Sequence, residues 1–561
     1  MNLTRRQFLL SSVASFGTTL FPMLGGLYAA SSDATNTKAA YPSFSVLNRI
    51  TYGSTPANLE HFNKIGLKQY LEEQLNPVDF DDQSCNERLS KATLHIEYKE
   101  NKDYKALSED RPLNSLNKPA EELWKLADNS NKMDYKERVR PAQEVRTATW
   151  IRAVYSKWQL HEIMVEFWHN HFNVHAFSNQ NIGATFPLYD TIMRKHCFGN
   201  FRALLEDVSQ SSAMLFYLNN AKSVASPANE NYARELFELH TLGADHYYNN
   251  LYNRWREVPG AVEGHPIGYI DQDVYEAARA FTGWTIEDGA NTGKGTIFPK
   301  TGKFTYFDGW HDNYQKRVLG VEFDPNSPPM ADGKKVLDLV AAHPGTAIHL
   351  CTKICRRLVS DNPPESLIKN AVQIWTSTAG QPDQIKSTVR AIILSPEFIE
   401  MQGQKMKRPL EYVISFLRAT DADVTPNENL FYAITGAGYK QFEWVTPTGH
   451  PDVAQYWLNT NTMLSNWNTL ENLFAGWFKA ASFSLASKTP SYIKTSQQIV
   501  EYWYERLVGT APSKETTDIL MNFMPYELEP DHLPDIHSKD FEDRLNNVVT
   551  LIGMLPHFHL R

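Results

Sequence analysis

The sequence predicts a mainly α-helical protein, built as one large domain of crossing helices in an orthogonal array, with a small β-hairpin inserted. Apolar residues recur with a helical period through residues 144–171, and again through residues 189–196 and 201–218. Strand-like alternation is clearest at residues 296–307, around a turn at residues 299–302. The pattern therefore indicates helices throughout and a single inserted hairpin.

Length and composition are those of a large globular protein. The chain has 561 residues, of which 42% are hydrophobic and 21% charged, enough to bury a deep core. The net charge of −9 and the lack of a lysine- or arginine-rich stripe argue against nucleic-acid binding. Its four cysteines form no Cys-x-x-Cys pair, which disfavours iron–sulfur, c-type haem and thiolate zinc sites.

Residues 1–30 predict a twin-arginine (Tat) export signal. Thr4-Arg5-Arg6 precedes Phe8-Leu9, and a moderately apolar run follows. That run contains Ser, Thr, Gly and Pro, and no later segment approaches a membrane-spanning length. We therefore expect a periplasmic or extracellular bacterial protein with no membrane span after signal removal. A polar linker is expected at residues 31–40 and the helical domain at residues 41–561.

The remaining elements follow in chain order. Residues 45–53 and 58–75 indicate helices, and the charged residues 79–137 indicate helices with loops. Asp273, three residues before Glu276, predicts a capping box at the start of a further helix. Proline in a first turn predicts helix starts at His343-Pro344 and at Pro409.

The most unusual stretch is residues 161–175. It holds four of the 18 histidines and two glutamates among aromatic and aliphatic residues. On a helix, Glu162, Glu166 and His169 lie on one stripe, together with Asn173. Buried imidazole and carboxylate groups are tolerated when they are paired, hydrogen-bonded or bound to metal. This stretch is therefore the first candidate for chemistry.

Three interpretations of its histidines stay open. Glu166-x-x-His169 has the carboxylate-then-imidazole step of di-metal helix bundles, with His171 on the opposite face. If the helix ends near Trp168, His169 and His171 instead point the same way, as in an extended metal-binding segment. In the first interpretation the histidines are structural core residues. In the second they are metal ligands, and in the third they carry out acid–base chemistry without a metal.

Residues 229–243 form a second segment with candidate functional side chains. This segment is predicted to be a helix that ends at Gly243. Arg234, Glu235 and Glu238 lie on one polar stripe and His240 on another face. A structural interpretation is a ladder of arginine and carboxylate pairs. The functional interpretation makes Glu235, Glu238 or His240 ligands or acid–base groups that face the first histidine helix.

Together these segments resemble the domain-of-unknown-function 1800 family. The resemblance rests on the run from Phe167 to Phe172, on residues 230–243, and on Asp273-Val274 with residues 278–284. Other matching blocks are Leu47-Asn48-Arg49 with Gly53, residues 74–77, His343-Pro344 and residues 407–411. The resemblance implies an exported, largely helical single-domain protein without an established activity. It also implies a possible exported partner that is alkaline-phosphatase-like or sulfatase-like.

The family blocks fall on a defined set of positions. They are Glu162, His169, His171, Glu230, Arg234, Glu235, Glu238, His240, Asp273, Arg279 and Trp284. Glu166 and His175 fall outside the pattern, which weakens the di-metal interpretation and favours Glu162. Residues 246–269 are longer than the family's usual connection, and we expect them to form a lid or partner loop.

These observations favour a metal-dependent exported hydrolase that acts on an envelope or extracellular polymer. A divalent Zn²⁺, Fe²⁺ or Mn²⁺ ion suits imidazole and carboxylate ligands. The expected metal ligands are His169, His171, Glu238 and His240, with Glu235 as an alternative carboxylate. The expected catalytic residues are Glu162, as ligand-orienting group or general base, Glu235, and Arg234, which with Arg279 would steer an anionic substrate.

Two alternatives remain open. One is a non-catalytic periplasmic scaffold or accessory subunit for the phosphatase-like partner, with its polar clusters as buried structural networks. The other is a di-iron oxidoreductase that uses Glu162, Glu166 and His169, although a second Glu-x-x-His step is absent. The sequence also lacks a Gly-x-Ser-x-Gly elbow, a P-loop and a dinucleotide fingerprint, which makes serine hydrolases, nucleotide hydrolases and nicotinamide enzymes poor candidates.

Overall fold

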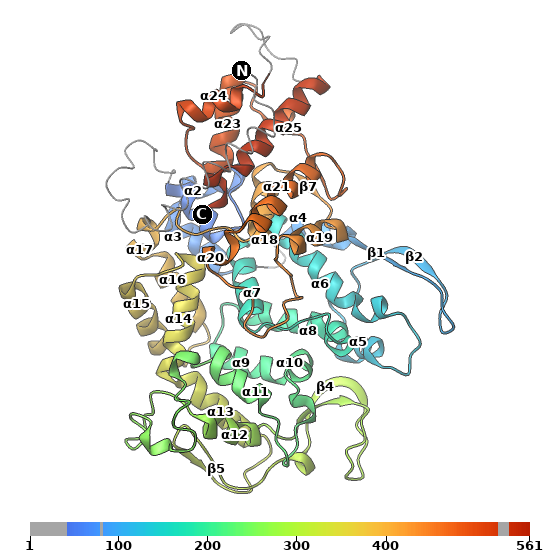
Figure 1. Cartoon of the computed structure of the whole chain (residues 1–561), viewed down its shortest axis with the longest axis vertical. Helices are drawn as coiled ribbons and strands as arrows, with labels where there is room; N and C mark the ends of the chain where they lie inside the picture. The colour runs from blue at the N-terminus through green and yellow to red at the C-terminus, as the bar shows by residue number, and fades with distance from the viewer. Residues whose placement is uncertain (1–41, 79–81, 525–537) are drawn as a thin grey trace. The chain divides into compact units, whose positions relative to one another are not determined.

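The computed structural model describes residues 42–78, 82–524 and 538–561. These residues form helices α2 to α25 and four two-stranded antiparallel sheets (Figure 1), so the prediction of a mainly helical fold with small hairpins is confirmed. The predicted export signal and linker lie outside the described ranges. No helix within those ranges is long and apolar enough to cross a membrane.

The chain divides into two compact units. Unit 1 takes its described residues from 42–70, 399–439 and 453–561, and unit 2 from 71–398 and 440–452. Two helices contain unit boundaries, α3 (Pro56–Leu75) and α17 (Pro396–Glu400). Each unit is therefore described by itself.

Unit 2 holds both segments with candidate functional side chains, residues 161–175 and 229–243. Its helices are α4 (Gln83–Lys91), α5 (Ala120–Ala127), α6 (Tyr135–Tyr155), α7 (Gln159–His171), α8 (Gln180–His196), α9 (Phe201–Gln210), α10 (Ser212–Tyr217), α11 (Glu230–Glu235), α12 (Asp271–Ala280), α13 (Ala331–Ala342), α14 (Pro344–Leu358), α15 (Glu365–Ser377) and α16 (Gln384–Ile393). Helix α8 packs against α5, α6, α7, α9 and α10, which makes it the centre of this array (Figure 1).

Side-chain caps begin several of these helices. Asn200 accepts a hydrogen bond from the Ala203 N–H at the start of α9. At α14, Nδ1 of His343 accepts from the Gly345 N–H, with Pro344 in the first turn. In α12 the carboxylate of Asp273 accepts from the Ile270 N–H, so the helix begins at Asp271, two residues earlier than the predicted capping box.

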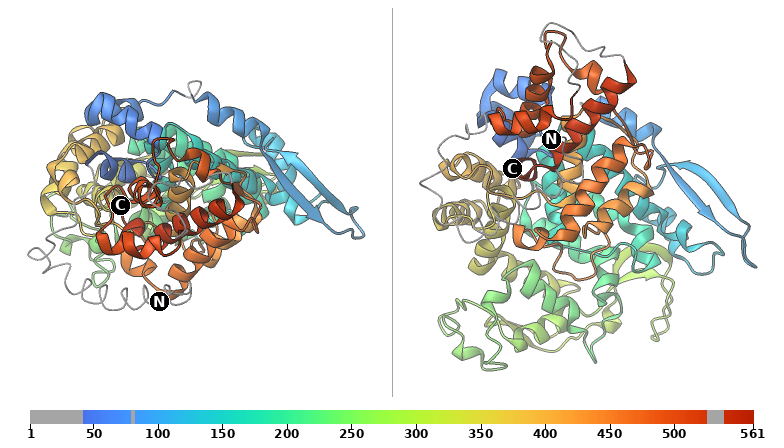
Figure 2. Two further views of the ribbon diagram at one scale, coloured as in Figure 1. Left: turned by 90° about the horizontal axis from the view of Figure 1, so that it is seen from above. Right: turned by 45° about the horizontal axis from the view of Figure 1, so that its top comes forward.

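The strands form hairpins only. Strand β3 (Trp284–Asp288) pairs with β4 (Lys300–Tyr306). A hairpin is therefore present, but its first strand lies earlier in the chain than residues 296–298, and residues 300–302 of the predicted turn belong to β4. Strands β1 (Thr93–Tyr98) and β2 (Leu107–Pro112) form a hairpin inside the region expected to be helices and loops. This hairpin extends away from the helices of its unit (Figure 2). Strands β5 (Lys316–Val318) and β6 (Val321–Phe323) form a third, shorter pair.

Unit 1 is also helical. Its helices are α2 (Pro42–Ile50), α18 (Pro409–Ala419), α19 (Glu428–Gly436), α20 (Ala454–Trp457), α21 (Thr460–Phe474), α22 (Leu485–Lys488), α23 (Ser496–Val508), α24 (Lys514–Met521) and α25 (Lys539–Met554). Helix α18 starts at Pro409, as predicted, and packs against α21 and α23. Strands β7 (Asp423–Val424) and β8 (Ala481–Ser482) form its one short sheet within the described residues.

Candidate functional site

The two histidines near the end of α7 lie in different environments. Nε2 of His169 lies 2.9 Å from Oδ1 of Asp190 on α8. His171 instead contacts the segment after α11 and helix α14. The structure therefore separates His169 and His171, which the sequence grouped as ligands of one metal.

His169 belongs to a buried network of charges together with Glu162. Arg194 of α8 donates from Nη1 to both carboxylate oxygens of Glu162 at 3.0 Å and from Nε to Asp190 at 2.8 Å. Asp190 links this arginine to His169. Although burial alone would raise the pKa of Glu162, the charge of Arg194 lowers it to about 2. Such a weak base suits an ion pair better than proton abstraction near neutral pH.

The segment 229–243 is not one regular α-helix. Helix α11 ends at Glu235 and a π-helical turn, Leu236–His240, follows it. Thr241 supports the wider turn by donating from Oγ1 to the Leu236 carbonyl at 2.5 Å. Gly243 then takes a φ of +90°, a conformation that glycine adopts without steric cost. Because π-helical turns often occur at functional sites, this turn marks the region around His240 as a candidate.

Two imidazoles satisfy carbonyl groups at the end of the π-helical turn. Nε2 of His171 donates to the carbonyl oxygen of His240 at 3.1 Å, and Nε2 of His349 on α14 donates to that of Leu239 at 3.2 Å. The ring of His349 also explains Gly243, because a Cβ at that position would lie 2.7 Å from Nδ1 of His349. Helices α7 and α14 therefore meet the turn through histidines.

Lys353, one turn after His349, completes this arrangement. Its Nζ lies 2.9 Å from Nδ1 of His171. Because an ammonium group only donates, Nδ1 accepts, and Nε2 of the same ring carries the proton that is given to the His240 carbonyl. We call Lys353, His171, His240 and His349 the lysine–histidine cluster. It runs from the fully buried His240 to the partly exposed His349 and Lys353.

His240 is the least satisfied member of the cluster. Its side chain is 0% exposed, and neither ring nitrogen has a hydrogen-bond partner in the described part of the chain. Its ring centroid lies 6.1 Å from that of His171. A buried polar group without a partner is costly, so its presence here asks for an explanation beyond packing.

Burial shifts the pKa of every member of the cluster toward the neutral form. It lowers the pKa of Lys353 to about 8, an effect that Asp452 partly opposes and Arg356 reinforces. Burial and the nearby Lys353 lower the pKa of His240 to about 3 and that of His349 to about 4. The pKa of His171 is also well below its usual value, for the same reasons.

Glu235 and Arg234, two of the predicted catalytic residues, are close to this cluster in sequence but are not members of it. Burial and the neighbouring charge of Glu238 raise the pKa of Glu235. Arg234 contacts Glu230 at 3.4 Å and Asp271 at 3.5 Å, and its side chain is 34% exposed. Its ion-pair partners are therefore Glu230 and Asp271.

Arg279 and Asp273 have separate partners in the structure. Arg279 holds Asp312, with Nε 2.7 Å from Oδ2 and Nη2 3.0 Å from Oδ1. Asp273 accepts from the backbone N–H groups of Ile270 and Leu319. Both side chains thus connect elements of the fold, as in the structural interpretation.

The predicted metal site does not come together as a ligand set. Within residues 42–78, 82–524 and 538–561, no three His, Cys, Asp or Glu side chains are grouped to hold a metal ion. Of the four predicted ligands, the structure brings His171 and His240 together. The lone pair of His171 that a metal would need accepts a hydrogen bond from Lys353. Metal binding remains a prediction.

Lys353 and His349 were missed from the sequence. They lie at i and i+4 on α14, so they share one helix face, and His343-Pro344 just before them is one of the family blocks. The neighbouring Cys351 and Cys355 are both buried free thiols. A lysine four positions after a histidine, on one face of the predicted helix, was the available signal.

The fold and the cluster define a mainly helical protein whose unusual polar centre lies at a π-helical turn. Residues 45–560 match the family described as "Protein of unknown function (DUF1800)". The match covers most of the chain, so the protein belongs to this family and the resemblance is confirmed. Comparisons with curated proteins and with solved structures gave no significant match.

Proposed function

We propose that the protein is an exported hydrolase in which the lysine–histidine cluster is the proton-transfer centre. The observation that carries this proposal is the 2.9 Å contact between Nζ of Lys353 and Nδ1 of His171. It lies next to the ring of His240, which has no hydrogen-bond partner within the described ranges. Perturbed titratable groups that share one location are typical of active sites. The predicted export signal directs the search for substrates to polymers of the envelope or extracellular space.

Lys353 suits the role of general base. With a pKa of about 8, roughly a tenth of its amino groups are neutral at pH 7, far more than for an ordinary lysine. A general base works best when its pKa lies near the working pH. The neutral amine would take a proton from water, and the resulting ammonium would be held by Nδ1 of His171.

His240 suits contact with a buried water molecule. Its two ring nitrogens offer one donor and one acceptor in the neutral form that its low pKa maintains. The π-helical turn directs this ring inward, and the hydrogen bond from His171 to the His240 carbonyl fixes the backbone there. A buried water molecule would satisfy the ring nitrogens, which have no hydrogen-bond partner among the described residues.

A metal-dependent version of this proposal requires a rearrangement. For His171 and His240 to bind a divalent ion together, Lys353 would have to release Nδ1 of His171. Metal analysis of the exported protein and of His240→Ala decides between the versions. Stoichiometric zinc, iron or manganese that is lost in the variant would support a metal centre and contradict Lys353 as the base.

The experiment that tests the proposal is a hydrolysis screen of the exported protein on chromogenic phosphate esters, sulfate esters, glycosides and acyl esters. For any activity found, Lys353→Met should lower kcat by about 100-fold or more, the range expected for loss of an acid–base group. Lys369→Met is the matched control, because Lys369 is 75% exposed and pairs with Glu365 on a single helix. Equal rates for wild type and Lys353→Met would contradict the proposal.

An accessory role is the second candidate, and one observation favours it. The family positions Glu162, His169, Asp273 and Arg279 all have structural partners, which is what a scaffold needs. The partner expected from the resemblance is alkaline-phosphatase-like or sulfatase-like. Stoichiometric co-purification of such a protein, with no hydrolysis by the isolated chain, would favour this role.

A further inference from the structure

Residues 440–452 of unit 2 form a loop that closes on itself and lies against the end of α7. The backbone N–H of Lys440 donates to Nε2 of His450 at 3.1 Å, so the two ends of the loop are joined. The hydroxyl groups of Thr446 and Thr448 lie 2.8 Å apart within the same segment. These internal contacts give the segment a defined shape, and we call it the 440–452 loop.

Asn170, the residue before His171 on α7, holds this loop through both ends of its amide group. Its Nδ2 donates to the His450 carbonyl at 3.0 Å, and its Oδ1 accepts from the His450 backbone N–H at 2.7 Å. Because Nε2 of His450 accepts from Lys440, Nδ1 carries the ring proton, and it lies 3.3 Å from the same Oδ1 of Asn170. One side chain thus satisfies both backbone groups of His450 and a ring nitrogen.

The loop is held on both sides of His171. Gly449 has a φ of +72°, and a Cβ at that position would collide with the carbonyl oxygen of Asn170, so the two backbones lie close together. Asn173, two residues after His171, donates from Nδ2 to two carbonyl groups of the loop at 3.0 and 2.7 Å. The loop therefore packs beside the residue that α7 contributes to the lysine–histidine cluster.

The loop ends at Asp452, whose charge acts on Lys353. The groups that face Lys353 are His171 from α7, His240 from the π-helical turn, His349 and Arg356 from α14, and Asp452 from the loop. Burial lowers the pKa of Lys353 to about 8, and the carboxylate of Asp452 limits this decrease. The imidazoles have lowered pKa values and are neutral at pH 7, and Arg356 is a cation. The negative charge in this set is therefore that of Asp452.

We propose that Asn170 is a positioning residue of the lysine–histidine cluster, because it holds the 440–452 loop where the Asp452 carboxylate balances the charge of Lys353. The inference rests on the proposed function, in which Lys353 takes a proton from water and becomes an ammonium group. A buried ammonium group is unfavourable unless an opposite charge lies near it. The loop thus stabilises the protonated form of the base, and Asn170 acts through the loop without touching the reacting atoms.

Competitive acylation of the full chain over a range of pH, followed by mass spectrometry of the Lys353 peptide, tests this assignment. Asp452→Asn should lower the midpoint of Lys353 labelling by about half a pH unit or more, because the balancing charge is lost. Asn170→Ala should lower the midpoint in the same direction. When both changes are combined, Asn170→Ala should cause no further decrease, because the carboxylate that it positions is absent.

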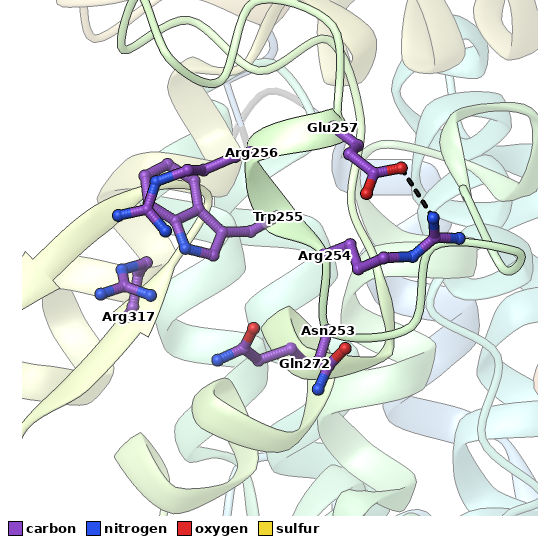
Figure 3. A pocket seen from close by; sticks show the side chains of 7 residues that line it. All are labelled: Asn253, Arg254, Trp255, Arg256, Glu257, Gln272 and Arg317. Carbon is purple, nitrogen blue, oxygen red and sulfur yellow. Dashed lines mark hydrogen bonds and ion pairs between the residues drawn. The ribbon is translucent and has the colours of Figure 1, made fainter.

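Two controls separate this effect from a general loss of structure. Asn200→Ala removes an amide that donates to two backbone carbonyl groups elsewhere in unit 2, at 2.7 and 2.9 Å, and should leave the Lys353 midpoint unchanged. Glu257→Gln removes a carboxylate in the segment expected to be a lid or partner loop. There Glu257 pairs with Arg254 at 2.8 Å and lines a pocket whose lining includes no member of the cluster (Figure 3). This variant should also keep the wild-type midpoint.

The positioning role and the proposed function fail through different results. A wild-type midpoint near pH 8 that Asn170→Ala leaves unchanged would overturn the positioning role and leave the proposed base intact. Equal decreases by Asn170→Ala with and without Asp452→Asn would overturn it too. If Asn170→Ala does not fold, Asp452→Asn keeps the shape of the side chain, and an unchanged midpoint in that variant would overturn the assignment. A wild-type midpoint of about 10 would contradict the proposed function and this assignment with it.

Discussion

Lys353 and His171 are joined by a hydrogen bond of 2.9 Å between Nζ and Nδ1, and the same imidazole donates through Nε2 to the His240 carbonyl at 3.1 Å. One ring thus connects helix α14, helix α7 and the π-helical turn. The arrangement places a lysine with a lowered pKa beside buried neutral imidazoles. It is the basis of the function proposed for this family member.

Acid should destabilise the protein through His240. Its folded pKa of about 3 lies below the usual 6.5 of the unfolded chain, so its contribution is fully present above pH 6.5 and is lost as the pH falls toward 3. At pH 5 this loss amounts to about 2 kcal/mol. Urea unfolding at pH 7 and pH 5 measures it, and His240→Phe should show a smaller difference than wild type. His95→Phe, at a position 55% exposed, should keep the wild-type difference. An equal pH dependence in all three proteins would contradict the assignment.

Alkaline pH should have the opposite effect through Lys353. Its folded pKa of about 8 is below the ordinary 10.4 for lysine, so the unfolded chain binds the proton more tightly between these values. The free energy of unfolding that is attributable to Lys353 should therefore rise as the pH increases from about 8 to about 10. Guanidinium unfolding of wild type and Lys353→Met across this range measures it. A constant difference between the two proteins would show that Lys353 has an ordinary pKa.

Gly243→Ala should disrupt the cluster. The φ of +90° disfavours alanine by about 1–2 kcal/mol, and the new Cβ would lie 2.7 Å from Nδ1 of His349. We expect a total loss of about 2–4 kcal/mol in urea unfolding. Gly264→Ala is the matched control, because Gly264 has a φ of +81° and no atom of the described residues lies within 4 Å of the place that a Cβ would take. Losses of equal size in both variants would mean that His349 does not restrict position 243.

Arg194→Met should be among the most destabilising single changes in unit 2. It would leave the carboxylates of Glu162 and Asp190 buried without their shared cation, which typically costs about 3–5 kcal/mol. Lys369→Met removes an exposed ion pair and should change stability by less than about 1 kcal/mol. Thermal unfolding of both variants checks the contrast. A small effect of Arg194→Met would show that the network around His169 is not structural.

Helices could be predicted from the sequence because apolar residues recur with a helical period over long stretches, and because capping residues lie next to the helix ends. The start of α14 followed from Pro344 and that of α18 from Pro409. The hairpin of β1 and β2 could not be predicted, because the residues of β2 are mostly exposed and so carry no alternation of apolar and polar residues. The first strand of the other hairpin was misplaced because β4 pairs with Trp284–Asp288, across the connection 289–299, and not with the nearer residues 296–298.

The candidate site was predicted only in part. His171 and His240 meet, but His169 turns to Asp190, a contact between helices that no spacing within α7 reveals. The π-helical turn has no distinctive residue types. The sequence pattern therefore could not show that the backbone widens before His240. Lys353 joins the cluster from a segment 182 residues away, and only the folded chain shows that contact.

The most direct test of the account is the titration of the Lys353 amine by competitive acylation, followed by mass spectrometry of its peptide. Labelling of the wild-type protein should follow a midpoint near pH 8, because burial lowers the pKa of this group. Denatured protein provides the reference, with a midpoint near the ordinary value of about 10.4. A midpoint of about 10 in the folded protein would contradict a neutral amine at the lysine–histidine cluster and, with it, the proposed active centre.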